Sequence, residues 1–169
     1  MQRANSGLRT FFIDSLQDIY YAEKHLVEAL ETLEEKATSQ DLKLAFSEHR
    51  DVTLTHVSRL EQVFSLMGEE AQTRKCEAIK GLIKEADAII NETETDTLTR
   101  DAALIMAAQK AEHYEIATYG TLATFARTMG ENQVAALLHE TLEEEKEADE
   151  KLTGIAESFI NESAEHEIA

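Results

Sequence analysis

One stretch, residues 102–127 with the sequence AALIMAAQKAEHYEIATYGTLATFAR, constrains the fold of this chain more than any other. Apolar residues recur along it at the three- and four-residue spacing of an α-helix: Ile105, Ala108, Tyr119, Leu122 and Phe125. Between Ala108 and Tyr119, the same stripe passes through Glu112 and Glu115. An unpartnered buried carboxylate costs several kcal/mol even after relaxation, so either this stripe faces water or positive charge lies opposite it.

The rest of the composition favours helices throughout. The chain has 169 residues, enough for one domain with a sizeable core, and it contains no Pro and only six Gly. Glu, Ala and Leu are the commonest residues, and runs of the β-branched residues that form strands are missing. We therefore predict an all-α protein in which residues 1–169 form a single domain.

Charge and cysteine content exclude several classes of partner and setting. The net charge of −18 repels phosphate backbones, so we expect no nucleic-acid partner. The single cysteine, Cys76, cannot form an intramolecular disulfide. The first thirty residues do not resemble a signal peptide, and no apolar run is long enough to span a membrane. We expect a reducing, cytoplasmic setting and no membrane partner.

The apolar stripes predict four long helices joined as two hairpins, with a shorter helix in the crossover between them. Gly68 and Gly130 should end the second and third long helices, and Asp96 or Thr97 should cap the start of the third. The five predicted helices, with the crossover helix third, span residues of about 7–36, 40–67, 75–91, 98–129 and 132–161.

Each of the other long helices also carries polar residues in the middle of its stripe. Glu23 interrupts the first helix, and His49 and His56 interrupt the second. The stripe of the last helix reads Leu138, Leu142, Glu145, Asp149, Leu152, Ala156 and Phe159. By helical phase, the three remaining histidines of the long helices should point elsewhere: His25, His113 and His139.

Counting back from the two hairpin turns places these interruptions at one height. Antiparallel helices rise equally per residue, so facing residues are equally far from their turn. Glu23 then lies level with about residue 54, just before His56, and Glu115 lies level with Glu145. Both pairs are about 23 Å from their turns in helices about 42 Å long, which is near mid-height.

Several carboxylates meeting in one buried layer cannot all stay ionised without cations. No Lys or Arg interrupts the stripes at that height, so a buried salt-bridge network is disfavoured and two metal ions are the predicted counter-charge. Oxygen-rich ligation with one or two imidazoles suits iron first and manganese second. The predicted metal ligands are Glu23, His49, His56, Glu112, Glu115, Glu145 and Asp149. A phase error of one residue would exchange Glu145 for Glu144.

Several segments resemble the ferritin-like YciE/YciF stress-protein family. The match covers nearly the whole chain, and its most specific part is AAQKAEHYEI at residues 107–116. The other matching segments are DIYYAEK at 18–24, FSEH at 46–49, RKCEAIKGLI at 74–83, RDAALI at 100–105 and ETLEEEK at 140–146. The resemblance implies a ferritin-like four-helix bundle with a long crossover, a dimetal site and a homodimer rather than a storage cage. It also implies a cytoplasmic bacterial protein linked to stress responses.

One departure from the family pattern concerns the ligands. The family usually places Glu followed by Thr where this chain has Val52 and Thr53, and the position of His56 is often not His. Val52 removes a carboxylate, and His56, one turn further on, is placed to replace it. Whether both metal positions fill therefore stays open at this point.

Three functions are compatible with such a site. A di-iron-type centre with an open coordination position can react with a small oxidant, oxygen or peroxide. Alternatively, the protein is a non-enzymatic dimeric scaffold whose site is structural or empty, or it sequesters iron. The sequence does not decide whether the chain is an enzyme, because all three functions need the same bundle.

Overall fold

The computed structural model describes residues 6–168, and every regular element in that range is helical. The all-α prediction is therefore confirmed. No helix of the described range is both long and apolar enough to cross a membrane. The elements are α1 (Gly7–Lys36), α2 (Gln40–Met67), α3 (Glu77–Glu92), α4 (Leu98–Thr128), α5 (Asn132–Ile155), η1 (Ala156–Ile160) and α6 (Asn161–Glu165).

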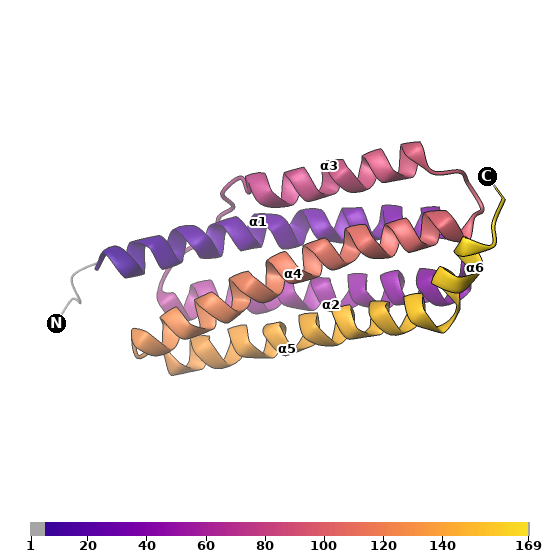
Figure 1. Ribbon diagram of the computed structural model, residues 1–169. Coiled ribbons are helices and arrows are strands. Elements are labelled where there is room, and N and C mark those ends of the chain that lie inside the picture. The colour runs from indigo at the N-terminus through magenta and orange to yellow at the C-terminus, as the bar shows by residue number, and fades with distance from the viewer. Residues whose placement is uncertain (1–5, 169) are drawn as a thin grey trace.

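The four long helices form two antiparallel hairpins packed side by side, as Figure 1 shows. Helix α1 packs against α2 and α4 packs against α5, and the hairpins meet mainly where α2 contacts α5. Helix α3 carries the chain along the bundle and lies outside it, over α1 and α4. This single long crossover makes α2 and α4 run in the same direction, which is the connectivity of ferritin-like bundles.

The helix boundaries follow from local chemistry at most ends. Gly68 and Gly130 adopt left-handed backbone conformations with φ of 72° and 78°, which glycine adopts without steric cost, and they follow the last turns of α2 and α4. Thr97 is the N-cap of α4, where its hydroxyl accepts a hydrogen bond from the Arg100 amide at 3.2 Å. These three boundary residues were predicted from the sequence.

The start of α2 is capped from another helix. Ser39 occupies the N-cap position of α2, but its side chain makes no cap bond. Instead, the buried carboxylate of Asp101 in α4 accepts hydrogen bonds from the backbone amides of Thr38 and Ser39, both at 2.7 Å. The neighbouring Arg100 donates to the carbonyl oxygen of Ile90 at 2.9 Å, near the end of α3. The first turn of α4 therefore ties together the ends of two other helices.

The C-terminal end of the last long helix departs from the predicted stripe. A π-helical turn, η1, interrupts the α-helical hydrogen bonding between α5 and α6. Its wider i→i+5 turns shift the next inward position by one residue. Phe159, predicted on the apolar stripe, is therefore 57% exposed, whereas Ile160 is 1% exposed and packs in the core.

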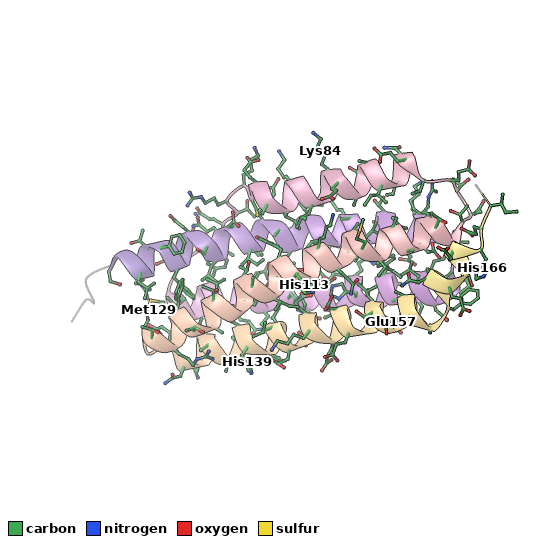
Figure 2. The ribbon with its side chains drawn as sticks, viewed as in Figure 1. Lys84, His113, Met129, His139, Glu157 and His166 are labelled. Carbon is green, nitrogen blue, oxygen red and sulfur yellow. The ribbon has the colours of Figure 1, made fainter. Side chains whose placement is uncertain are left out.

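Two apolar clusters fill the two halves of the bundle. One contains large side chains of the half that holds the start of α1, including Phe12, Leu16, Phe64, Leu122 and Leu138. The other occupies the opposite half and includes Leu33, Leu42, Phe46, Leu104, Ile105 and Leu152. Charged side chains at the surface project into solvent, as Figure 2 shows for Lys84 on α3 and His139 on α5. The interrupted positions of the stripes lie between the two clusters.

Candidate metal centre

A buried layer of carboxylates and imidazoles crosses the bundle between its two apolar clusters. All four long helices contribute to this layer, because each one turns the interrupted part of its stripe inward. Five of its six side chains are at most 3% exposed, and that of His49 is 11% exposed. The layer consists of Glu23 from α1, His49 and His56 from α2, Glu112 and Glu115 from α4, and Glu145 from α5.

The layer divides into two groups, each with the composition of a metal site. In each group, every residue offers one ligand atom, and these atoms all lie within 4.8 Å of one another. The first group is His49, Glu112, Glu115 and Glu145, and the second is Glu23, His56 and Glu145. Glu145 belongs to both groups, so its two oxygen atoms are placed to bridge them.

The two imidazole rings approach different oxygen atoms of the shared Glu145 carboxylate. His49 Nε2 lies 3.1 Å from Glu112 Oε1 and 3.5 Å from Glu145 Oε2. His56 Nδ1 lies 2.9 Å from Glu145 Oε1 and 3.4 Å from Glu23 Oε1. Each ring therefore presents one nitrogen to two carboxylates.

Many polar atoms of this layer have no hydrogen-bond partner within the described chain. A buried polar atom without a partner is rare in proteins, and each one costs free energy. Close approaches such as that of His56 to Glu145 lack the geometry of a hydrogen bond. The unpartnered buried atoms are Glu23 Oε2, His56 Nδ1, Glu112 Oε2, Glu115 Oε1 and both carboxylate oxygens of Glu145. All of them are metal-ligand atom types, so the residues present fit a pair of cations.

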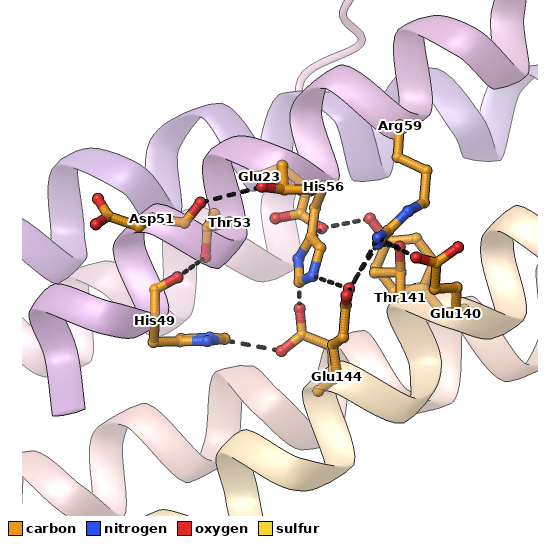
Figure 3. Close-up of polar contacts among 12 residues, drawn as sticks. Glu23, His49, Asp51, Thr53, His56, Arg59, Glu140, Thr141 and Glu144 are labelled. Carbon is orange, nitrogen blue, oxygen red and sulfur yellow. Dashed lines mark hydrogen bonds and ion pairs between the residues drawn. The ribbon is translucent and has the colours of Figure 1, made fainter.

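Side chains next to the buried layer hold the residues of the layer in position. Glu144 Oε2 lies 2.9 Å from His56 Nε2 and also accepts a hydrogen bond from Arg59 Nη1 at 2.6 Å (Figure 3). On the other side of the layer, the buried hydroxyl of Tyr119 donates to Glu23 Oε1. That bond occupies Oε1 of Glu23, whereas Oε2 is buried without a hydrogen-bond partner in the described chain.

Arg59 corrects the sequence analysis, which found no basic residue on the stripes at this height. Arg59 lies one residue off the α2 stripe and is nevertheless buried. It pairs with Glu140 and Glu144 at the edge of the layer, while the inner carboxylates keep their unpartnered atoms. A basic residue one turn after His56 and an acid next to Glu145 were the available signals.

Crowding and burial shift the proton affinities of the layer in the metal-free state. Burial raises the pKa of Glu112 and of Glu145 to about 7, and it also raises the pKa of Glu23 and Glu115. Burial alone would lower the pKa of His56, but its close contacts with the carboxylates of Glu145 and Glu23 raise it to about 10. Without metal, the layer therefore holds protons as its counter-charge.

The pKa of the other imidazole shifts in the opposite direction. Burial lowers the pKa of His49, which favours the neutral ring that binds metal ions.

The structure leaves one predicted ligand outside both groups. Asp149 Oδ1 accepts a hydrogen bond from Gln109 Nε2 at 3.0 Å, and its Oδ2 lies 3.2 Å from His113 Nε2. Its side chain is 20% exposed, and that of His113 is far more so. The exchange of Glu145 for Glu144 does not occur, because Glu145 faces inward and Glu144 faces Arg59.

The fold and this layer together define a carboxylate-rich, ferritin-like four-helix bundle with candidate metal ligands at mid-height. The chain belongs to the family described as a domain of unknown function, DUF892, whose model matches residues 7–165. The resemblance found in the sequence is thereby confirmed.

Three comparisons show how close the similarity is. The chain is 47% identical to protein YciF of Escherichia coli K12 over 156 residues, which are 92% of this chain and 93% of that protein. The crystal structure of the E. coli stress protein YciF matches with a TM-score of 0.88 and 45% identity, over 93% of this chain and 99% of that one. YcfI of Rhodopseudomonas palustris matches with a TM-score of 0.85 and 38% identity, over 90% and 97% of the two chains.

Proposed function

We propose that this chain is a dimetal carboxylate protein whose two positions take iron first and manganese second. The observation that carries the proposal is the set of six unpartnered, buried ligand atoms on five residues of one layer. Four carboxylates of the two groups carry four negative charges when ionised, and two divalent cations would balance them. Oxygen-rich ligation with one imidazole per metal is typical of iron and manganese sites.

The contacts assign a role to each side chain. Glu145 would bridge the two metals, Glu112 and Glu115 would bind the one nearer His49, and Glu23 would bind the one nearer His56. His56 would bind through Nδ1, since its Nε2 faces the carboxylate of Glu144.

That outer contact supports Nδ1 as the ring nitrogen of His56 that would bind metal. A second-shell carboxylate holds a ligating imidazole in one tautomer and raises its basicity. Arg59 in turn holds Glu144 through both guanidinium nitrogens, at 2.6 and 3.1 Å. Arg59 and Glu144 therefore act as positioning residues for the proposed ligand His56.

A bound pair of redox-active metals supplies the electrons for reduction of oxygen or peroxide. The chain's own residues exclude water, since the layer is almost inaccessible, and Tyr119 orients Glu23 through its hydroxyl. Because YciF of E. coli is described as a stress protein, we further propose a cytoplasmic, stress-related role in handling such oxidants.

Metal stoichiometry tests the proposal. We expect the parent protein, loaded anaerobically with Fe(II) or with Mn(II) and desalted, to hold about two metal ions per chain by elemental analysis. Glu145→Gln should lose most of both ions, because it removes the ligand that the two groups share. Glu143→Gln, an exposed change on the same helix, should keep the parent value.

The same measurement has outcomes that contradict the proposal. If the parent protein retains no metal after the loading step, the non-enzymatic scaffold is the function that remains. Equal metal content in Glu145→Gln and Glu143→Gln would place the metal elsewhere. We propose a homodimer, and particle mass separates it from a storage cage that sequesters iron.

A further inference from the structure

A cavity of about 260 Å³ lies beneath the crossover helix and reaches the metal layer. Helices α1, α3 and α4 form its walls, and at its inner end lie His49, Glu112 and Glu115. Most of its remaining lining is aliphatic, including Leu26, Leu30, Leu82, Ile83 and Ile90. The cavity is therefore an apolar space with polar groups at one end.

The cavity exists because the helices around it present small side chains at this point, whereas larger side chains fill the space between helices in the rest of the bundle. Its walls include five alanines, namely Ala29, Ala86, Ala107, Ala108 and Ala111. Helix α3, which covers it, buries only Ile79 fully, so the helix shields the space without filling it. A leucine at one of the alanine positions would occupy part of this volume.

Two of the unpartnered buried atoms assigned to the metal proposal belong to residues that line this cavity. Both Glu112 and Glu115 line the cavity and are at most 2% exposed. Glu112 Oε2 and Glu115 Oε1 have no hydrogen-bond partner in the described chain. An occupant of the cavity would thus lie next to the ligand atoms of the proposed metal position.

The rim of the cavity indicates the charge of its occupant. Glu28 and Asp87 line the outer part, so an anionic head group would meet like charge at the rim of the metal-free protein. His25 also lines the cavity, and its Nδ1 is engaged by the Tyr21 carbonyl oxygen at 2.8 Å. Its Nε2 is then the ring atom that can meet a neutral hydroxyl group.

We propose that this cavity binds a neutral aliphatic molecule with one polar end, such as a medium-chain primary alcohol. Its size supports this class, because apolar cavities of about 150 Å³ already bind benzene, and this one is larger. As a substrate pocket, the inference rests on the proposed metal function, since the ligand would lie against that centre. As a binding site, it stands on the cavity alone.

Calorimetric titration with 1-octanol and with octanoate, on metal-free and Mn(II)-loaded protein, tests the inference. We expect 1-octanol to bind both forms, and octanoate to bind the metal-free form at least about tenfold more weakly than 1-octanol. Ala86→Leu, which fills the cavity from α3, should weaken 1-octanol binding by at least about tenfold without changing the metal content. Ala88→Leu, on the exposed side of the same helix, is the matched control and should bind like the parent.

Other outcomes separate the two proposals. Octanol binding to a protein that holds no metal would support the cavity and leave the metal function without support. Metal binding without octanol binding would overturn the cavity proposal alone. Equal octanol affinity in the parent and Ala86→Leu, or octanoate bound to the metal-free protein as tightly as octanol, would also overturn it. Ala29→Leu fills the space from α1, so matching losses in both variants exclude a local folding defect in α3.

Discussion

Among the residues of the layer, Glu115 illustrates most clearly the cost of burying an ionisable side chain. It is 1% exposed, one of its oxygens has no partner, and burial together with the charges of Glu145 and Glu23 raises its pKa well above the ordinary value. In the metal-free protein this carboxyl is held neutral at a cost in stability. With metal, the same atom becomes a ligand.

The substitution Glu115→Gln should therefore have opposite effects in the two states. It keeps the volume and removes the ionisable group, so we expect the metal-free variant to be more stable than the parent at pH 7 by about 1 to 3 kcal/mol. With Mn(II), the variant should bind less metal and gain less stability by mass action. Melting curves with and without chelator, beside elemental analysis, measure both effects. Unchanged metal content would remove Glu115 from the proposed ligands.

The roles of single residues could be predicted where those residues lie on an apolar stripe. Glu23, His56 and Glu145 lie on apolar stripes, so their inward placement followed from helical periodicity. Arg59 and Glu144 could not be placed in this way, because residues one step off a stripe face inward or outward depending on how neighbouring helices are rotated. That rotation is set by packing between hairpins.

At the scale of elements, the start of α4 contacts both α2 and α3, although no pattern in the sequence links these helices. The Asp101 carboxylate accepts two backbone hydrogen bonds from the start of α2, and Arg100 binds the end of α3. Nothing in the periodicity of any one helix encodes these contacts, since they link different helices, and the Asp101 bonds join residues about 60 positions apart. The first turn of α4 therefore forms hydrogen bonds with both the crossover and the first hairpin.

We expect Asp101→Asn to destabilise the protein by about 1 to 3 kcal/mol. The amide keeps one acceptor oxygen but presents an N–H₂ group to a second backbone donor, so one of the two bonds to Thr38 and Ser39 is lost. Denaturant unfolding of the metal-free protein measures the change. Asp51→Asn, an exposed change on α2, is the control and should stay within about 0.5 kcal/mol of the parent. Equal stability of the two variants would show that the cap contributes nothing.

The π-helical turn marks the limit of periodicity at this scale. Stripe counting assumes one constant helical period, and it placed Phe159 inside. Helix η1 breaks that period, so Ile160 enters the core and Phe159 turns outward. The other long helices keep a constant α-helical period between their caps, and there the stripes predicted the buried residues well.

At the scale of the whole molecule, the metal-free protein should become less stable as pH rises from 6.5 to 9. Glu112 and Glu145, with pKa values of about 7 against an ordinary 4.5, lose their native-state protons as pH rises through 7. His56, at about 10 against 6.5, stays protonated only in the folded state across this range. Both shifts mean that the folded state binds more protons, so its stability falls with pH. The lowered pKa of His49 acts in the opposite direction, but below pH 6.5.

Metal should reverse this trend. Ligands bind metal in their deprotonated forms, so Mn(II) affinity and the stabilisation it confers increase with pH. Melting curves at pH 6.5, 7.5 and 8.5, at constant ionic strength, with chelator or with Mn(II), measure both slopes. A metal-free protein whose melting temperature rises over this range would contradict the assigned proton affinities.

The bundle could be predicted at this scale because distances within a hairpin follow from counting residues. Glu115 and Glu145, counted as level, do meet in one group. Counting residues gives the height of a side chain along the bundle but not the direction in which the side chain points. Asp149 is on the stripe, but its contacts with Gln109 and His113 hold it at the edge of the layer. The crossover helix could be recognised as amphipathic, whereas the cavity beneath it depends on how α3 sits on α1 and α4.

The division of the layer between the two hairpins also sets an order of events. The first hairpin carries Glu23 and both histidines, and the second carries the three remaining glutamates. During synthesis, the whole first hairpin exists before the ribosome has reached Glu112, so a nascent chain offers at most half of the set. Capture of a metal pair of the proposed kind must then be a late step, completed only after translation has delivered α5 and the two hairpins have closed on each other.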